Sequence, residues 1–257
     1  MKKVILISID GMRPDAFLQC GNPYISTMIS EWAYTLSGRT VVPSVTLPCH
    51  LSMFYSVPPS RHGITTNDFM PFVCPLNGIF DQLKQAGKTC ASFYAWDEMR
   101  DLGRPGSVKI LGYRNAWLDE NSDEVITDMA LECMKKDAPD FVFLYLGDTD
   151  EKGGHGFGWM SEEYLKYVSV ALDCVKKVAE TCPEYEIIVT ADHGGHDRTH
   201  GTESEEDMII PQFYLCEGLS GGEVLSDVSI LDIPPTVAEL LGVAAVEEWE
   251  GKSVLKK

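Results

Sequence analysis

Acidic and imidazole side chains directly follow an apolar run in the second half of the chain. The run E-I-I-V-T is typical of a buried strand and leads into A-D-H-G-G-H-D-R-T-H-G at residues 191–201. Asp192 and His193 therefore stand at the carboxyl end of a predicted strand, the edge where open α/β sheets bind ligands. A loop with glycines can return His200 to this edge, and His196 is an alternative. Aspartate and histidine are ligands that suit Zn²⁺ and related ions.

Two other predicted strands end in the same kinds of residues. The run K-V-I-L-I-S-I stops at Asp10, and the run D-F-V-F-L-Y-L opens into a polar segment that contains Asp150 and His155. Because the carboxyl ends of parallel strands meet at one edge of a sheet, these side chains are expected to lie close together. Asp148 and Glu151 belong to the same segment and are alternatives to Asp150 as a ligand.

Thr46 and Asn67 are candidates for binding an anion between these acidic groups. Pro48 is tolerated in the first turn of a helix, which places Thr46 near a helix N-terminus. Exposed N–H groups and the helix dipole favour an anion there, although by pattern alone Thr46 is more simply interpreted as an N-cap. Asn67, in the polar loop that follows, is a neutral hydrogen-bond donor, and His62 in that loop is interpreted as structural.

The charge balance predicts two metal ions. Three clustered carboxylates would repel one another, and at least one would take up a proton unless a counter-charge were present. Asp10, Asp150 and Asp192 together with an ionised Thr46 hydroxyl carry four negative charges, and two divalent cations carry four positive charges. This balance supports a two-metal site.

Six short motifs, spread along nearly the whole chain, together resemble the alkaline phosphatase superfamily and, within it, the type I phosphodiesterase/nucleotide pyrophosphatase branch. A stretch I-L-D-I-x-P-T around Asp232 is also similar to the C-terminal helix entry of that superfamily. The six motifs are I-D-G at Asp10, T-L-P-C-H at Thr46, R-H-G-I-x-x-N ending at Asn67, D-x-x-x-x-H at Asp150, D-H-G at Asp192 and H-G at His200.

The resemblance implies a site with two divalent ions, Zn²⁺ in the first place and Mn²⁺ as the alternative. It implies that Thr46 is the nucleophile, which forms a covalent intermediate, and that Asn67 steadies a phosphoryl oxygen. In this family the histidine usually follows the aspartate of the second pair by four positions, whereas His155 follows Asp150 by five. The implied ligands are Asp10, Asp192, His193 and the Thr46 oxygen for one ion, and Asp150, His155 and His200 for the other.

The implied activity is that of a metal-dependent hydrolase of phosphodiester or pyrophosphate bonds. A neutral Asn67 beside the nucleophile, in place of a guanidinium fork, favours a singly charged diester. A phosphomonoesterase or phosphomutase of the same superfamily is one alternative, and a catalytically silent metal- or phosphate-binding module is another. A sulfatase is disfavoured because no C-x-P-x-R pattern follows at Cys49. Four arginines are candidates to fold into the pocket: Arg13, Arg61, Arg100 and Arg198.

The composition of the chain limits the kinds of binding partner that are expected. The chain has 257 residues and a formal net charge of −18, which disfavours nucleic acid polymers and anionic membranes because both would be repelled. A small phosphorylated substrate is the expected partner, and the oligomeric state is left open. Eight cysteines without a C-x-x-C pair are interpreted as reduced and mostly buried. The apolar run at the N-terminus is too short for a signal peptide or a membrane span, so a cytoplasmic location is expected.

The alternation of predicted strands and helices indicates one α/β domain over residues 1–257. The expected fold is a three-layer α/β/α sandwich with a mostly parallel central sheet and an alkaline-phosphatase-like core. Residues 96–120 break the alternation and are the candidate for a small lid insertion, and residues 209–216 are expected to form an edge strand.

Overall fold

One seven-stranded sheet organises the protein, in the order β2-β7-β6-β1-β5-β3-β4. A computed structural model describes residues 2–68, 70–73 and 75–255. Apolar runs form the inner strands, because a strand covered on both faces buries side chains in both directions. The five parallel strands are β1 (Lys3–Ile9), β3 (Cys90–Tyr94), β4 (Ile110–Tyr113), β5 (Phe141–Leu146) and β6 (Tyr185–Thr190). The remaining two are β2 (Ala33–Arg39) and β7 (Ile209–Leu215).

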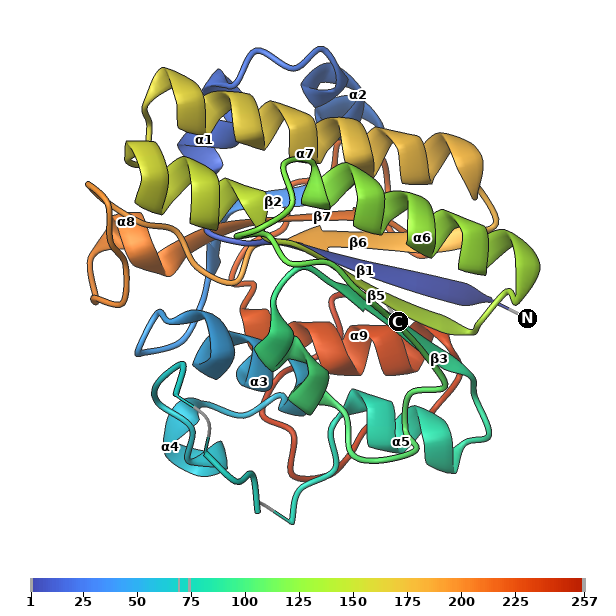
Figure 1. The fold of residues 1–257 in the computed structure, drawn as a ribbon. Coiled ribbons are helices and arrows are strands. Elements are labelled where there is room, and N and C mark those ends of the chain that lie inside the picture. The colour runs from blue at the N-terminus through green and yellow to red at the C-terminus, as the bar shows by residue number, and fades with distance from the viewer. Residues whose placement is uncertain (1, 69, 74, 256–257) are drawn as a thin grey trace.

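Helices cover both faces of the sheet, as Figure 1 shows. One layer contains α1 (Pro14–Gln19), α2 (Tyr24–Glu31), α6 (Ser122–Lys136) and α7 (Glu162–Thr181). The other layer contains α3 (Thr46–Tyr55), α4 (Pro59–His62), α5 (Ile79–Gln85) and α9 (Ile233–Leu240). The short helix α8 (Glu205–Met208) precedes β7, and the 3-10 turn η3 (Ile230–Asp232) precedes α9. The predicted three-layer sandwich with a mostly parallel sheet is confirmed.

The order of the inner strands brings the predicted ligands together. Strand β1 pairs in parallel with β5 on one side and with β6 on the other. The pairing matches Ile9 with Leu146 and Ser8 with Thr190, so the three strands end side by side. The chain after each strand therefore leaves the sheet at the same edge.

The prediction of an edge strand at residues 209–216 is wrong, because β7 lies between β6 and β2. It runs antiparallel to both neighbours. Pro211 cannot donate a hydrogen bond to a neighbouring strand, and a proline within a strand sequence therefore indicates an edge strand. Here it is accommodated because the register between β2 and β7 shifts between Thr35 and Gly38, next to the proline.

Residues 96–120 are more regular than expected. They contain the 3-10 helix η1 (Asp97–Leu102) and the strand β4, which extends the sheet in parallel to β3. The flanks of the segment contribute Trp96, Ala116 and Trp117 to the cavity at the ligand edge. The role of these flanks as a lid stays a prediction.

The cysteines that the structure describes match the expectation that they are reduced and mostly buried. Seven are free, and six of those are buried, while Cys74 lies outside the described residues. Among the helices that the structure describes, none is both long and apolar enough to cross a membrane.

Candidate active site

The first group of ligand candidates lies at the ends of β1 and β6. Ligand atoms of Asp10, Asp192 and His193 all lie within 4.8 Å of one another. The His193 Nε2 atom is 3.3 Å from Asp10 Oδ1 and 3.3 Å from Asp192 Oδ2. All three side chains are buried.

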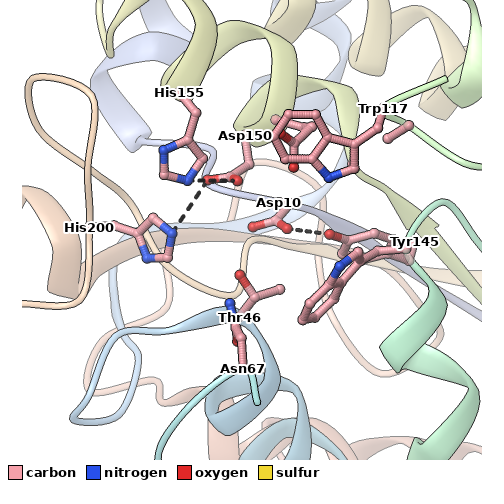
Figure 2. A pocket seen from close by; sticks show the side chains of 12 residues that line it. Asp10, Thr46, Asn67, Trp117, Tyr145, Asp150, His155 and His200 are labelled. Carbon is pink, nitrogen blue, oxygen red and sulfur yellow. Dashed lines mark hydrogen bonds and ion pairs between the residues drawn. The ribbon is translucent and has the colours of Figure 1, made fainter. Parts of the chain in front are cut away.

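The second group combines Asp150, His155 and His200, again with ligand atoms within 4.8 Å of one another. Asp150 Oδ2 is 3.4 Å from His155 Nε2, and Asp150 Oδ1 is 3.9 Å from His200 Nε2. Figure 2 shows both imidazoles pointing toward the Asp150 carboxylate. The two groups adjoin, because the rings of His193 and His200 stack with centroids 3.8 Å apart.

A π-helix explains the unusual spacing in the second group. Residues Thr149–His155 form the π-helix η2, in which hydrogen bonds connect residues five apart. Asp150 and His155, separated by five positions, therefore lie on the same face, as residues four apart do in an α-helix. The extra residue of this segment is absorbed by the wider turn.

The three histidines share one orientation, which prepares them to bind cations. The Nδ1 of each ring donates to a backbone carbonyl: His155 to Arg198 at 3.0 Å, His193 to Gly194 at 2.7 Å and His200 to Ser44 at 2.9 Å. Because a carbonyl oxygen only accepts, the proton is on Nδ1, and a neutral ring then presents its Nε2 lone pair to the carboxylates. Such outer hydrogen bonds fix ring orientation in metal sites. Burial, reinforced by repulsion from His193, lowers the pKa of His200 to about 3.

Each of the three carboxylates has one buried oxygen without a hydrogen-bond partner, namely Asp10 Oδ1, Asp150 Oδ1 and Asp192 Oδ2. Burial and repulsion from Asp192 raise the pKa of Asp10 well above its ordinary value. Burial, with repulsion from Asp10 and Asp192, does the same to Asp150. Burial raises the pKa of Asp192 to about 7. Unsatisfied buried acceptors of this kind require a compensating charge, and the donor set of carboxylates and imidazoles fits divalent metal ions.

Thr46 lies beside the first group and faces the cavity. It is the first residue of α3, and the N-cap is Val45, so the interpretation of Thr46 as an N-cap is wrong. Its Oγ1 is 3.1 Å from His193 Nε2. The Leu47 N–H donates to Asn67 Oδ1 at 2.9 Å, which leaves the Asn67 amide hydrogens to the cavity beside Thr46 (Figure 2).

The cavity in front of these residues has a volume of about 440 Å³. Its described lining contains no lysine or arginine side chain. Arg13 pairs with Asp15 and Glu206, and Arg100 pairs with Asp97 and Asp101. Arg61 pairs with Glu250, and Arg198 is likewise not among the described lining residues. None of the four candidate arginines thus provides a guanidinium for a phosphate dianion.

The alternative ligands lie outside both groups. Asp148 accepts a hydrogen bond from the Ser122 hydroxyl and pairs with Lys152 Nζ at 3.0 Å. His196 Nδ1 is 2.7 Å from Asp207 Oδ1. Asp150 and Glu151 both line the cavity, but of the two only Asp150 belongs to a ligand group. The geometry therefore favours Asp150 and His200 over these alternatives.

Two residues that support the site were not singled out from the sequence. Tyr145, the residue before the end of β5, donates its hydroxyl hydrogen to Asp10 Oδ2. His50 is buried between Ser8, 3.0 Å from its Nε2, and the Thr46 carbonyl, 2.8 Å from its Nδ1. The position of His50, four residues after Thr46 in a predicted helix, was the available signal.

Trp159 connects the three loops that carry the ligands. Its Nε1 donates to the Gly11 carbonyl at 2.9 Å, and its backbone N–H donates to the Asp197 carbonyl at 2.8 Å. The indole fills the space beside Gly154 and Gly195, where an added Cβ would lie only 2.5 Å and 2.2 Å from ring atoms. Glycine is required at both positions for the ring to fit.

A cluster of carboxylates and imidazoles at the carboxyl edge of a three-layer α/β sandwich is the arrangement of an alkaline-phosphatase-like metalloenzyme. The family model of the metalloenzyme superfamily matches residues 110–245, just over half of the chain. A second model, type I phosphodiesterase/nucleotide pyrophosphatase, matches residues 4–77. The chain belongs to the metalloenzyme superfamily, and the resemblance to the type I phosphodiesterase branch is confirmed.

Curated relatives match only in part. A 2,3-bisphosphoglycerate-independent phosphoglycerate mutase of Bacteroides thetaiotaomicron is 27% identical over 145 residues, 53% of this chain and 28% of the mutase. Human ectonucleotide pyrophosphatase/phosphodiesterase family member 1 is 27% identical over 219 residues, 74% of this chain and 23% of the human protein. The chain thus spans about a quarter of the length of these relatives.

Solved structures share the fold over almost the whole chain. Murine ectonucleotide pyrophosphatase/phosphodiesterase 5, an inactive variant in complex with AMP, superimposes with a TM-score of 0.81 at 15% identity and covers 96% of both chains. A phosphonate monoester hydrolase from Silicibacter pomeroyi gives a TM-score of 0.78 at 15% identity, covering 99% of this chain and 76% of that one. At this identity the similarity establishes the fold.

Removing and restoring divalent ions tests the two groups. Ions that bind the folded state alone add about 4 kcal/mol at a free concentration 1,000 times the dissociation constant, so Zn²⁺ should raise the melting temperature of chelator-treated protein by on the order of 10 °C. We expect two bound ions per chain, and one for Asp192→Asn, by titration calorimetry. Asp148→Asn, which changes a buried aspartate outside both groups, should still bind two. An unchanged melting temperature and no bound ion would contradict the site.

Replacing Trp159 tests whether the three loops depend on one side chain. We expect Trp159→Ala to lower the free energy of unfolding by about 3–5 kcal/mol and to weaken Zn²⁺ binding, because the loops lose their common contact. Trp249→Ala is the matched control, since Trp249 is also buried and donates its Nε1 hydrogen to Asn77 at 2.9 Å. The control should lose stability but keep its affinity for Zn²⁺, and equal losses of affinity in both variants would refute the connecting role. Denaturant unfolding and calorimetry measure the two quantities.

Proposed function

We propose that the protein hydrolyses phosphodiester or pyrophosphate bonds of a small substrate, with two divalent metal ions and a covalent intermediate at Thr46. The observation that carries this proposal is the position of the Thr46 hydroxyl, in the cavity wall and 3.1 Å from His193 in the first ligand group. The family matches support the same class of reaction.

The ligand groups suit the two ions in this proposal. Asp10, Asp192 and His193, with the Thr46 oxygen, would hold one ion. Asp150, His155 and His200 would hold the other. The mixture of imidazole and carboxylate donors favours Zn²⁺, with Mn²⁺ as the alternative. When bound, the ions supply positive charge that stabilises an ionised hydroxyl and the charge that develops on the leaving oxygen.

The residues of the chain would perform the remaining steps. The Thr46 oxygen attacks phosphorus in line with the leaving oxygen, which forms a phosphothreonine-type ester and breaks the bond to the leaving group. Asn67, whose Oδ1 is held by the Leu47 N–H, donates from Nδ2 to a phosphoryl oxygen. Water then attacks the phosphorus of this ester, which breaks the bond to Thr46, restores its hydroxyl and releases the phosphoryl group as the second product.

The cavity favours a substrate with one negative charge on the reacting phosphorus. A monoester dianion usually requires a guanidinium or ammonium group beside the nucleophile. Within the described lining, Asn67 is the neutral donor beside Thr46, and no lysine or arginine accompanies it. A diester monoanion therefore fits better than a monoester.

Replacing Thr46 tests the nucleophile. Thr46→Ala should lower kcat by at least about 10³-fold, because the attacking oxygen is removed, while most of the affinity for Zn²⁺ remains. Thr46→Ser keeps a hydroxyl and should retain measurable activity. The assay is hydrolysis of bis-(p-nitrophenyl) phosphate after chelation and addition of Zn²⁺ or Mn²⁺. Full activity of Thr46→Ala would exclude the proposed intermediate.

Comparing two esters tests the substrate class. We expect kcat/KM to be higher for bis-(p-nitrophenyl) phosphate than for p-nitrophenyl phosphate, because the described cavity lining has no lysine or arginine for a dianion. A preference for the monoester would point to a phosphatase, and transfer of phosphate to an added hydroxyl compound would point to a mutase. Tight Zn²⁺ binding without hydrolysis of either ester would identify a binding module.

A further inference from the structure

The loop of residues 194–202, which we call the ligand loop, determines the positions of two imidazoles in the second ligand group. The loop contains His200 itself. The carbonyl of Arg198 in the same loop accepts the hydrogen bond from His155 Nδ1 at 3.0 Å. The conformation of the ligand loop therefore sets where His200 lies and how the ring of His155 is turned.

Asp207, in the short helix α8, holds both halves of the ligand loop. Its side chain is fully buried. Its Oδ1 accepts a hydrogen bond from His196 Nδ1 at 2.7 Å, and its Oδ2 accepts from the N–H and the hydroxyl of Thr202 at 2.8 and 2.7 Å. One carboxylate thus joins a residue that precedes His200 to a residue that follows it.

The backbone of α8 packs against the start of the ligand loop. The Gly194 N–H donates to the Asp207 carbonyl at 2.8 Å, and the Gly195 N–H donates to the Glu206 carbonyl at 2.9 Å. A Cβ on Gly194 would lie only 2.0 Å from the Glu206 carbonyl oxygen, so glycine is required there. These contacts do not involve the carboxylate of Asp207, and a substitution of that side chain leaves their groups in place.

The Thr202 end of the ligand loop is connected to His200 through Ser44. The Ser44 hydroxyl donates to the Thr202 carbonyl at 2.7 Å, and the Ser44 carbonyl accepts from His200 Nδ1 at 2.9 Å. Because Asp207 fixes Thr202, it also stabilises the Ser44 carbonyl that orients this imidazole. Ser44 closely precedes Thr46, so the same contacts connect the ligand loop to the proposed nucleophile.

The first ligand group is held by other contacts. Asp192 Oδ1 accepts from the Gly11 N–H at 3.1 Å, and His193 Nδ1 donates to the Gly194 carbonyl at 2.7 Å. Neither contact involves the Asp207 carboxylate. A change in this carboxylate is therefore expected to disturb the second group and to leave the first in place.

His196 and Asp207 stabilise each other. The hydrogen bond to Asp207 raises the pKa of His196. Burial alone would raise the pKa of Asp207, but hydrogen bonds from His196 and Thr202 hold it below its ordinary value. A hydrogen bond to an ionised carboxylate is about twice as strong as a neutral one, so this pair is a firm attachment for the loop.

Resting on the two metal ions of the proposed function, we propose that Asp207 is a positioning residue that, with His196, holds the ligand loop in the conformation that the second ion requires. Neither residue is a ligand, because both lie outside the two ligand groups. Their effect on the ion passes through His200 and through the carbonyl that orients His155.

Replacing Asp207 tests this role through the affinity for each ion. Asp207→Asn keeps the volume, but an amide accepts through one atom only, so either His196 or Thr202 loses its acceptor. We expect the second ion to bind about 10–100-fold more weakly, as when the partners of metal ligands are replaced elsewhere, and the first ion to bind as in the wild type. Titration of chelator-treated protein with Co²⁺, followed by calorimetry and visible absorption, measures both steps.

Asp140→Asn is the matched control. Asp140 Oδ2 likewise accepts from the N–H and the hydroxyl of one threonine, Thr89, both at 2.8 Å, but it precedes β5 at the amino end of that strand. This control should lose stability and keep both affinities. The binding step that disappears in Asp150→Asn identifies the second ion.

Two substitutions of His196 separate a positioning role from a ligand role. His196→Asn keeps a side-chain N–H group for the Asp207 carboxylate and should retain most of the affinity for the second ion. His196→Ala removes the donor and should weaken binding as Asp207→Asn does. An asparagine variant as weak as the alanine variant would overturn the positioning role of His196, because it would show that the imidazole itself is needed.

Hydrolysis of bis-(p-nitrophenyl) phosphate by the wild-type protein separates the two proposals. If Asp207→Asn weakens only the second ion and the wild type hydrolyses no ester, the proposed function is wrong and the positioning role stands. If the wild type hydrolyses the diester and Asp207→Asn binds both ions as the wild type does, the proposed function stands and the positioning role is wrong. Equal losses of affinity for both ions, or a wild type that binds one ion only, would also overturn the positioning role.

Discussion

The repulsion among three buried aspartates is the constraint on which the rest of the structure depends. Asp10, Asp150 and Asp192 lie at one edge of the sheet, and each keeps one oxygen without a hydrogen-bond partner. Tyr145 and the Gly11 N–H bind the other oxygens of Asp10 and Asp192, which fixes the directions of the unsatisfied ones. Without a bound counter-charge, burying three carboxylates together does not stabilise the folded chain. The histidines are oriented through Nδ1, so that their Nε2 lone pairs face the carboxylates. This arrangement of facing acceptors is stabilised when cations lie between them.

The sequence was sufficient to predict the sheet edge and to predict which side chains would lie close together there. Strand-forming runs that end in aspartate place carboxylates at carboxyl ends, and parallel pairing then brings those ends together. His155 follows Asp150 by five residues instead of the usual four, and this spacing left Asp148 and Glu151 as alternative ligands. The π-helix explains the spacing, because its turn returns every fifth residue to the same face. Such a turn has no reliable signal in one sequence, although two consecutive glycines are compatible with it.

The features that escaped prediction depend on contacts between distant segments. Trp159 is adjacent in sequence to one ligand loop only, yet its ring and backbone reach Gly11 and Asp197 in the other two. The interior position of β7 depends on β2, which lies about 170 residues earlier in the chain and pairs outside it. A pattern of apolar and polar residues identifies a strand, but it does not show whether another strand pairs with its outer side.

Because of the distribution of charge, we expect anion binding to depend on the metal ions. The chain carries a formal net charge of −18, and its described cavity lining contributes carboxylates without lysine or arginine. Nothing else in that lining offsets the repulsion of a phosphate. The ions would therefore both attract the substrate and activate Thr46, so a chain without ions would lose binding together with chemistry. The same reasoning limits the substrate, because the described lining offers no lysine or arginine to a negative charge beyond the reacting phosphate.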